Sequence, residues 1–259
     1  PSVWKVPQCG RKTLDLNIIL MRATNLRTKQ KCGICHTRVL VAVYSFLFMK
    51  VPSQYHILIA CEESQAVCKE FREYGFQAFS CDLQDCSGGH PEWHIIGDAV
   101  TVLNSKKWDL VIAHPPCTRM ANSGVMWLEK RNLWKDLDKA TDFFNEFVKY
   151  GKQGNKIAIE NPIPHKYAVE KIGKYSQVIQ PYMFGHTERK ATCLWLFGLP
   201  ELKETNNVME EMKKLPKNEQ QRIHYLPPGK ERAKLRSKTF KGIAEAIATQ
   251  WGAFLLNGY

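Results

Sequence analysis

Apolar and polar positions follow two different periods from residue 55 to the end of the chain. Short apolar runs bounded by charged residues, proline or glycine predict strands, and segments with apolar residues three and four apart predict helices. The strand-like runs are 56–61, 77–83, 108–116, 156–162 and 191–200, and the clearest helical segments are 65–75 and 137–151. Repeated strand–helix–strand spacing predicts an α/β fold, a mostly parallel sheet with helices on both faces.

The ends of these elements carry their own signals. Gly75 and Gly151 each follow a helical run and are predicted to end it, because glycine adopts the left-handed conformation of a helix C-terminus. Phe144 and Phe147 lie on one face of the second helix, which predicts that this face is buried. The run 156–162 is predicted to stop at Pro162, since proline cannot donate to a strand ladder.

Polar and reactive side chains gather at the predicted carboxyl ends of the strands. In parallel α/β sheets these ends lie at one edge, and ligands bind there. The residues concerned are Glu62, Glu63 and Ser64 after the first strand, Asp82 and Asp98 after the next two, Cys117 after the fourth and Glu160 after the fifth. Five strand ends are therefore predicted to meet at one rim.

The acidic strand ends indicate a nucleoside ligand. Asp82 is placed to accept hydrogen bonds from ribose hydroxyls, and Asp98 could meet an adenine amino group. Taken alone, either residue is also typical of a cap or a turn. The first turn has no G-x-G-x-x-G and the chain has no G-x-x-x-x-G-K-[ST], so we expect neither a dinucleotide nor a P-loop. S-adenosylmethionine, a nucleoside without phosphates, fits better.

Cys117 directly follows His114-Pro115-Pro116 and is either a buried structural thiol or a nucleophile. A cysteine acts as a nucleophile when its neighbours stabilise the thiolate or activate the group that it attacks. Glu160, on the next strand end, could supply a proton to a substrate ring nitrogen, and Asn161 could orient the same ring. Three further cysteines are predicted to pack as small apolar residues: Cys68, Cys81 and Cys193.

The order of these motifs resembles the DNA (cytosine-5) methyltransferases. Pro116-Cys117 followed by Glu160-Asn161 is similar to the paired Pro-Cys and Glu-Asn signatures of that family, and "GFQAFSCDL", "GDAV" and "HPPC" precede "IENP" in the expected order. The segments 183–198 and 237–252 resemble the family's later Gln-x-Arg-x-Arg block and its final helix. The resemblance spans roughly residues 55–252 and implies a Rossmann-like S-adenosylmethionine-dependent methyltransferase fold.

The resemblance also implies roles for individual residues. Cys117 would add to carbon 6 of a flipped-out cytosine, Glu160 would donate a proton at ring nitrogen 3, Asn161 would position the loop, and Arg189 or Lys190 would orient the base. Of these two cations we favour Arg189. The cofactor contacts that it implies are Cys61, Glu62, Ser64, Gln65, Asp82, Leu83, Asp98, Ala99 and Pro115.

The chain departs from the family pattern in ways that leave two other functions open. The first turn reads "ACEESQAV" where the family has Phe-x-Gly-x-Gly, and "HPPC" is also similar to the D/N-P-P-Y/F loop of amino-group methyltransferases, which form no covalent adduct. The alternatives are therefore an N4-cytosine or N6-adenine DNA methyltransferase, or a degenerate protein that binds DNA or S-adenosylmethionine without catalysis.

The formal charge of +12 is concentrated in two segments. Residues 1–48 carry +7 and residues 213–241 carry +8, which leaves −3 for the rest of the chain. The second basic segment is the better candidate for contact with the phosphates of double-stranded DNA, although a solvated lysine-rich surface would look the same. It overlaps a region too small for much direct base readout, so we expect short or relaxed sequence specificity.

The predicted organisation has four parts: an N-terminal segment 1–48, a catalytic core 49–200, a small basic insert 201–236 and a C-terminal helix 237–259 that packs back on the core. We interpret Met49 as the initiator and 1–48 as translated upstream sequence, which also discounts Cys32-x-x-Cys35 as a zinc site. No metal and no membrane contact is expected, since the apolar run 39–49 is too short to span a bilayer. A cytoplasmic protein of a prokaryotic or virus-infected cell is predicted.

Overall fold

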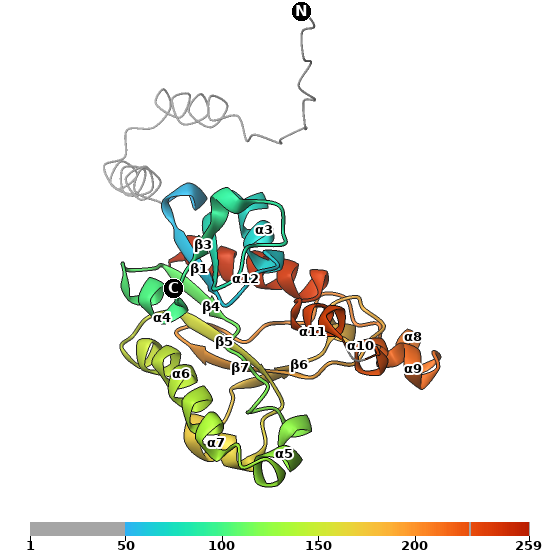
Figure 1. Ribbon diagram of the computed structural model, residues 1–259. Helices are drawn as coiled ribbons and strands as arrows, with labels where there is room; N and C mark the ends of the chain where they lie inside the picture. The colour runs from blue at the N-terminus through green and yellow to red at the C-terminus, as the bar shows by residue number, and fades with distance from the viewer. Residues whose placement is uncertain (1–49, 228, 259) are drawn as a thin grey trace, which may run out of the picture. The chain divides into compact units, whose positions relative to one another are not determined.

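The structure is a computed structural model that describes residues 50–227 and 229–258 (Figure 1). The predicted core, basic insert and C-terminal helix lie within these ranges, apart from residues 49, 228 and 259. The interpretations placed on residues 1–48, on Met49 as an initiator and on the pair Cys32 and Cys35 lie outside the described residues.

A seven-stranded sheet in the order β3-β2-β1-β4-β5-β7-β6 organises the molecule. The strands are β1 (His56–Ala60), β2 (Gln77–Asp82), β3 (His94–Ile96), β4 (Leu110–Ala113), β5 (Ile157–Pro162), β6 (Gln177–Ile179) and β7 (Thr192–Phe197). The first five strands pair in parallel. The predicted α/β fold with a mostly parallel sheet is therefore confirmed, and its strand order is compatible with a Rossmann-like fold.

The β7 strand is the exception to the parallel arrangement. It lies between β5 and β6 and pairs antiparallel with both. Asn161 and Pro162 at the end of β5 face Cys193 and Thr192 of β7, so β5 ends at Pro162 as predicted. The sequence motif that follows Met183 therefore enters the sheet next to the strand that carries Glu160.

One face of the sheet is covered by α3 (Ala66–Glu73) and α12 (Lys241–Asn257), as Figure 1 shows. Alternate side chains of β1 and β4 on this face pack against both helices in one apolar cluster. Trp251 of α12 is fully buried there, and its indole N–H donates to the carbonyl oxygen of Pro200 at 3.0 Å. Burial of such a side chain stabilises the fold by about 1.5–3 kcal/mol.

The opposite face is covered by α4 (Ala99–Asn104), α6 (Trp134–Lys152) and α7 (Lys166–Ile172). The remaining side chains of β1, β4 and β5 point to this side, where Phe144 and Phe147 of α6 are fully buried. Helices on both faces were predicted, and the two separate apolar clusters confirm them.

One predicted helix boundary is wrong. α6 was expected to end at Gly151, but the helix continues to Lys152 and Gly151 is buried inside it. A Cβ atom at this position would lie 2.4 Å from Cγ of Phe197, so the glycine allows close packing of α6 on β7. Gly154, with φ of +88°, takes the left-handed conformation that follows the helix.

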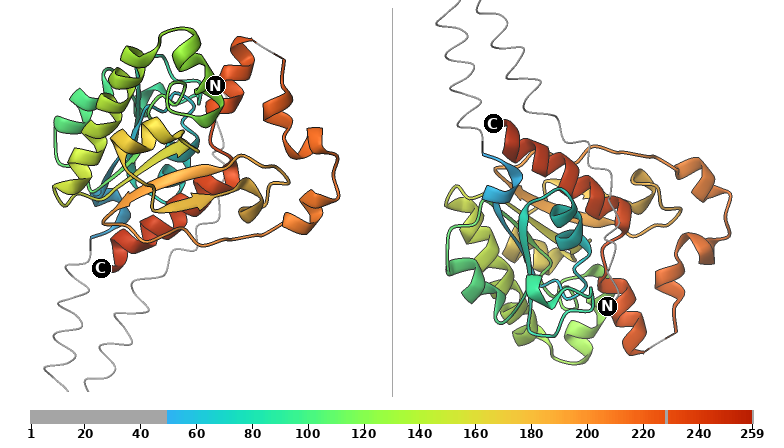
Figure 2. Two further views of the ribbon diagram at one scale, coloured as in Figure 1. Left: turned by 90° about the horizontal axis from the view of Figure 1, so that it is seen from below. Right: turned by 90° about the horizontal axis from the view of Figure 1, so that it is seen from above.

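The basic insert leaves the sheet after β7 and stands out beside the β6 edge, as both views of Figure 2 show. It contains α8 (Met209–Lys213), α9 (Lys217–Gln220), α10 (Arg222–Tyr225) and α11 (Lys230–Ser237). Outside the insert, the short helix α5 (Met126–Lys130) follows the loop after β4. The single 3-10 turns are η2 (Pro52–Gln54), η3 (Pro91–Trp93), η4 (Asn122–Gly124) and η5 (Pro181–Met183). None of the helices in the described ranges is long and apolar enough to cross a membrane.

Candidate active site

The strand order reverses between β1 and β4, and this switch point forms the candidate site. The chain leaves β1 toward the α12 face and leaves β4 toward the α6 face. In sheets with such a reversal, ligands bind outside the carboxyl ends of these two strands, and we refer to this region as the crevice. The backbone N–H of His114, one residue beyond β4, donates to the carbonyl oxygen of Ala60 at 2.9 Å. The segments 61–65 and 114–117 therefore meet at the same place.

A carboxylate occupies the position at which a phosphate would bind in a dinucleotide fold. The buried side chain of Glu62 accepts hydrogen bonds from the N–H groups of Val67 at 2.7 Å and Cys68 at 3.2 Å, at the beginning of α3. A helix N-terminus attracts anions, and here the protein supplies its own. This arrangement explains in structural terms why the sequence lacks a glycine-rich phosphate loop.

The rest of the first turn is tightly held by internal bonds. Cys61 and Gln65 have φ of +59° and +56°, a left-handed backbone that only a constrained turn imposes on such residues. The fully buried amide of Gln65 bonds both backbone groups of His90, so it anchors the segment before β3. Ser64 accepts a bond from the N–H of Ala66. The roles of Cys61, Ser64 and Gln65 toward a cofactor stay predictions.

Asp82 and Asp98 both accept the local hydrogen bonds that are expected of a turn or cap residue. Oδ1 of Asp82 accepts the N–H of Gln84 at 3.1 Å, and Oδ1 of Asp98 accepts the N–H and the hydroxyl of Thr101, both at 2.8 Å, which caps α4. Within the described residues, Oδ2 of each carboxylate receives no hydrogen bond from the protein. One oxygen of each therefore remains able to accept from a ligand.

Two large apolar side chains lie exposed beside these carboxylates. Leu83, directly after Asp82, is 75% exposed, and Ile96, which pairs with Asp82 across the strands, is 63% exposed. Ala99, by contrast, is buried as the first residue of α4. Exposed apolar groups next to acceptor oxygens suit a flat heterocycle with hydroxyl or amino donors.

Cys117 lies in a tight turn directly beyond the two prolines. Its carbonyl oxygen accepts the N–H groups of Met120 at 3.0 Å and Ala121 at 2.9 Å, so the turn folds back on the cysteine. Pro115 is buried, whereas Cys117 is only partly buried. Burial raises the pKa of the Cys117 thiol, and the nearby Lys190 and Arg236 lower it, with the net pKa above its usual value. At rest the thiol is protonated.

His165 fixes this turn to the strand that carries Glu160, and no pattern in the sequence signals this role. The buried imidazole accepts the N–H of Ala168 on Nδ1 at 3.1 Å, so Nε2 carries the proton and donates to the carbonyl oxygen of Arg119 at 2.8 Å. The backbone adds bonds from His165 to Met120 and from Asn122 to Ile163. Cys117 is thus held by the loop after β5 as well as by β4.

His114 and Glu160 form an ion pair in the crevice, with 3.1 Å between Nδ1 and Oε2. Burial lowers the pKa of His114, but Glu160 and Glu62 raise it, and the net pKa lies above that of an ordinary histidine. Burial raises the pKa of Glu160, but His114 and Lys190 lower it, and the net pKa lies below its usual value. At neutral pH the pair is therefore an imidazolium and a carboxylate.

Buried polar atoms at this edge keep unused hydrogen-bonding capacity. Nε2 of His114, Oε2 of Glu160 and both amide atoms of Asn161 make no aligned hydrogen bond within the described residues. Buried polar atoms are nearly always satisfied, so such a group calls for a functional explanation. Glu160 and Asn161 are successive strand residues and point to opposite faces of the sheet. Glu160 shares the crevice with His114, whereas Asn161 lies behind it.

The structure brings Lys190, and not Arg189, to the reactive cluster. Lys190 is close enough to Cys117 and Glu160 to shift the pKa of both, and its ammonium donates to the carbonyl oxygen of Arg236 at 2.7 Å. Arg189 is exposed, and its backbone N–H bonds Gln220 of the insert. The degenerate sequence motif did not distinguish between these two neighbouring residues.

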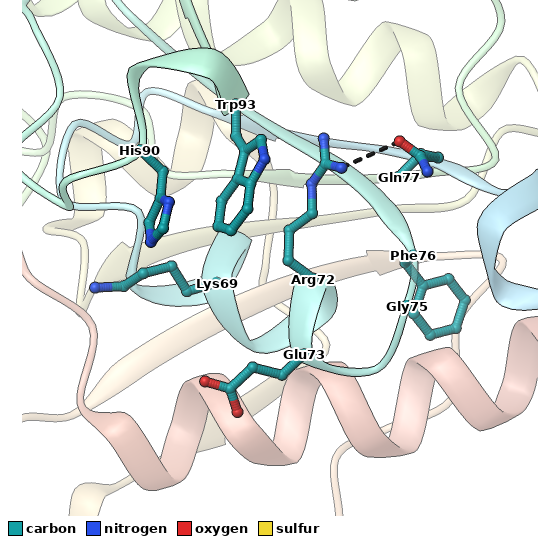
Figure 3. A pocket seen from close by; sticks show the side chains of 8 residues that line it. All are labelled: Lys69, Arg72, Glu73, Gly75, Phe76, Gln77, His90 and Trp93. Carbon is teal, nitrogen blue, oxygen red and sulfur yellow. Dashed lines mark hydrogen bonds between the residues drawn. The ribbon is translucent and has the colours of Figure 1, made fainter. Parts of the chain in front are cut away.

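A cavity of about 400 Å³ lies away from this cluster, at the opposite edge of the sheet. It is lined by residues of α3 and by the segments that lead into β2 and β3 (Figure 3). His90 stacks on Trp93 with 3.8 Å between ring centroids, and Cζ of Arg72 lies 5.1 Å from the same indole ring. Both faces of Trp93 are thus occupied by the protein itself.

Among the described residues, no group of three or more His, Cys, Asp or Glu side chains could hold a metal ion. Cys68, Cys81 and Cys193 are fully buried, which confirms their predicted packing role.

A scan of the chain against protein-family models finds no match, and a search of the curated proteins finds none either.

Proposed function

We propose that this chain is a DNA (cytosine-5) methyltransferase in which Cys117 attacks the target base and S-adenosylmethionine is the methyl donor. One observation carries the proposal: a partly buried thiol shares the switch-point crevice with a largely buried acid–base pair and a partly buried cation. The thiol is Cys117, the pair is His114 and Glu160 at 3.1 Å, and the cation is Lys190.

The chemistry of this cluster fits a cytosine ring better than a phosphate or a carboxylate. A cytosine edge offers a ring nitrogen that accepts a hydrogen bond and an amino group that donates one. Glu160 and His114 present both kinds of partner: Nε2 of His114 has no hydrogen-bond partner within the described residues, and the Glu160 carboxylate, paired with His114 through Oε2, can accept a further bond. Lys190 lowers the pKa of Cys117 and would stabilise its thiolate. Cys117 would then be free to add to the activated ring.

The residues at the ends of β2 and β3 fit the nucleoside part of S-adenosylmethionine. Asp82 and Asp98 each keep one carboxylate oxygen for ribose or adenine donors, and the exposed Leu83 and Ile96 could cover the faces of the ring. Glu62 already fills the phosphate position at α3, in agreement with a ligand without phosphates. When bound, this cofactor supplies the methyl group.

The surface around Cys117 supports a nucleic-acid partner. Trp127 of α5, ten residues after the cysteine, is 39% exposed, and Cζ of Arg131 lies 4.3 Å from its ring centroid. On the other side, α11 of the basic insert approaches the site through the bond from Lys190 to Arg236. Extruding a base costs a few kcal/mol, which stacking and phosphate contacts must supply. We therefore include double-stranded DNA in the proposal.

Trp127→Ala is expected to weaken binding of duplex DNA by about 5- to 150-fold, because aromatic stacking on a base contributes about 1–3 kcal/mol. Fluorescence anisotropy with a labelled duplex at fixed salt measures the change. Tyr74→Ala is the matched control, since Tyr74 is 45% exposed at the far end of α3 and should not alter the affinity. An equal loss in both variants would place the DNA elsewhere.

The decisive test is trapping of the covalent adduct. The full chain is incubated with tritiated S-adenosylmethionine and a duplex that contains 5-fluorocytosine, in which the fluorine blocks the final elimination. A denaturation-resistant, labelled protein–DNA complex is expected, together with label transfer to ordinary duplex DNA. Absence of both trapping and transfer, with cofactor and DNA binding intact, would instead indicate the degenerate binding protein.

An amino-group DNA methyltransferase is the second candidate, and the raised pKa of Cys117 favours it. Such an enzyme forms no adduct and needs no thiolate, so a thiol that is protonated at rest would not slow its reaction. Methyl transfer to ordinary duplex DNA without any trapped complex would select this candidate.

For either enzyme we propose the cytoplasm of a prokaryotic or virus-infected cell. The six cysteines of the described residues are all free thiols, in keeping with a reducing compartment.

A further inference from the structure

His114 is the least expected member of the cluster, and three charged groups face it. Glu160 approaches from the end of β5, Glu62 from the turn after β1, and Lys190 from the segment before β7. The imidazole side chain is 13% exposed, and its Nε2 has no partner within the described residues. On one side the imidazole contacts the Glu160 carboxylate, and on the other side lies Glu62, whose pKa is raised by burial. The histidine is thus placed to hold a proton next to Glu160.

We propose that His114 is the proton store of the site: its imidazolium supplies the proton that reaches the target ring nitrogen through the Glu160 carboxyl group. This inference rests on the proposed function and deepens it. Glu160 alone cannot serve as the donor at neutral pH, because it is a carboxylate held ionised by His114 and Lys190. The available proton is on His114, 3.1 Å from Oε2 of Glu160, within reach for transfer.

Protons and electrons balance in the addition step. The Cys117 thiol releases its proton to solvent, and Sγ forms a bond to carbon 6. The electron pair of the carbon 5–carbon 6 double bond moves into the ring toward nitrogen 3. Nitrogen 3 takes a proton from Glu160, and Glu160 takes one from Nδ1 of His114, which becomes neutral. Without cofactor, carbon 5 of the adduct takes a proton from solvent with an electron pair of the ring. On elimination water removes the original hydrogen from carbon 5, that bonding pair re-forms the double bond, Sγ leaves as thiolate, and the nitrogen 3 proton returns through Glu160 to His114.

The pair has a defined pH window. The folded pKa of Glu160 lies below its ordinary value of 4.5, so its contribution to stability is complete above that value and is lost as the pH falls through the folded pKa. The folded pKa of His114 lies above its ordinary value of 6.5, so its contribution is complete below that value and is lost as the pH rises through the folded pKa. The proton store is therefore full at neutral pH and empties on the alkaline side.

The first test reads the protonation of His114 directly. The full chain, labelled with ¹⁵N-histidine, is titrated by NMR, with His114→Gln to assign the signal and free histidine in the same buffer as the reference. His114 is expected to stay an imidazolium to higher pH than free histidine. In Glu160→Gln, which removes the largest charge that holds the proton, His114 should titrate at lower pH than in the wild-type chain. Titration of His114 below free histidine in the wild-type chain would overturn the proposal.

The second test needs no cofactor. After addition of Cys117 to carbon 6, carbon 5 takes a solvent proton and then loses its tritium as Sγ is eliminated. Release of tritium from duplex DNA with [5-³H]cytosine therefore reports addition and protonation without methyl transfer. His114→Gln is expected to slow this release by about 10²- to 10⁴-fold and to remove the alkaline fall of the wild-type pH profile. His114→Asn serves if the glutamine variant does not fold, and His56→Gln should match the wild type.

Two results would overturn the proposal in distinguishable ways. If the wild type releases tritium and both His114 variants release it at the same rate with the same pH profile, the proton comes from elsewhere, and the proposed function stands. If the wild type gives neither tritium release nor a trapped complex, the proposed function fails, and the proton-store role fails with it. In that second case the NMR titration still shows whether the buried ion pair exists.

Discussion

Cys117→Ser is expected to lower methyl transfer to duplex DNA by about 10⁴-fold or more, with no trapped complex on 5-fluorocytosine DNA. The serine side chain has nearly the same size, so the turn held by Met120 and Ala121 should persist. A serine hydroxyl does not ionise in the range in which Lys190 can assist a thiol, and it cannot add to carbon 6 at a useful rate. Initial rates with saturating cofactor and DNA measure the change.

The matched control is Cys86→Ser, because Cys86 is also a partly exposed free thiol but lies in the segment between β2 and β3. It should keep wild-type transfer and trapping. Binding of S-adenosylmethionine and DNA to Cys117→Ser should stay within about threefold of the wild type, since the substitution removes a reactive atom and not a binding surface. Undiminished transfer by Cys117→Ser would contradict the covalent mechanism and select the amino-group enzyme.

The rim of the site could be predicted from the sequence because it depends on local patterns. An apolar run followed by a polar residue marks a strand end, and parallel strands bring such ends to one edge. This reasoning places Glu62 and Cys117 at one rim, and the bond from His114 to Ala60 confirms that β1 and β4 are neighbours. The cap made by Asp98 also follows from residue type and position.

Contacts between distant segments could not be predicted in the same way. The antiparallel entry of β7 beside β5 depends on a crossover through β6, a strand of only three residues. His165 bonds Arg119 across 46 positions of sequence, and no periodicity announces such a bond. Gly151 was predicted as a helix end from its residue type alone. Its actual role, close packing against Phe197, involves a residue of a different element and could not be seen in the local sequence. Each of these features is decided by tertiary contact rather than by local preference.

The choice between Lys190 and Arg189 shows this limit most clearly, since both lie in one motif and differ by one position. The resemblance to a Gln-x-Arg-x-Arg block favoured Arg189 as the cation that orients the base. In the structure the ammonium of Lys190 donates to the carbonyl oxygen of Arg236 in α11, and Lys190 is partly buried, while Arg189 is exposed. Which residue approaches Cys117 and Glu160 depends on how the segment before β7 packs against α11, and the motif does not specify that contact.

Lys190→Met should therefore slow methyl transfer by about 10²-fold, the loss typical of removing one preorganised charge from an active site, whereas Arg189→Met should change it by less than about threefold. The methionine keeps the length of the side chain and removes its charge. Because Lys190 lowers the pKa of Cys117, its loss raises that pKa further, so less thiolate forms at any given pH.

The alkylation rate of Cys117 by iodoacetamide, followed by mass spectrometry against pH, measures this change in pKa without any turnover. Its alkaline rise should move to higher pH in Lys190→Met and stay in place in Arg189→Met. The reverse result would restore Arg189 as the cation of the site and would place Lys190 in a purely structural contact with the basic insert.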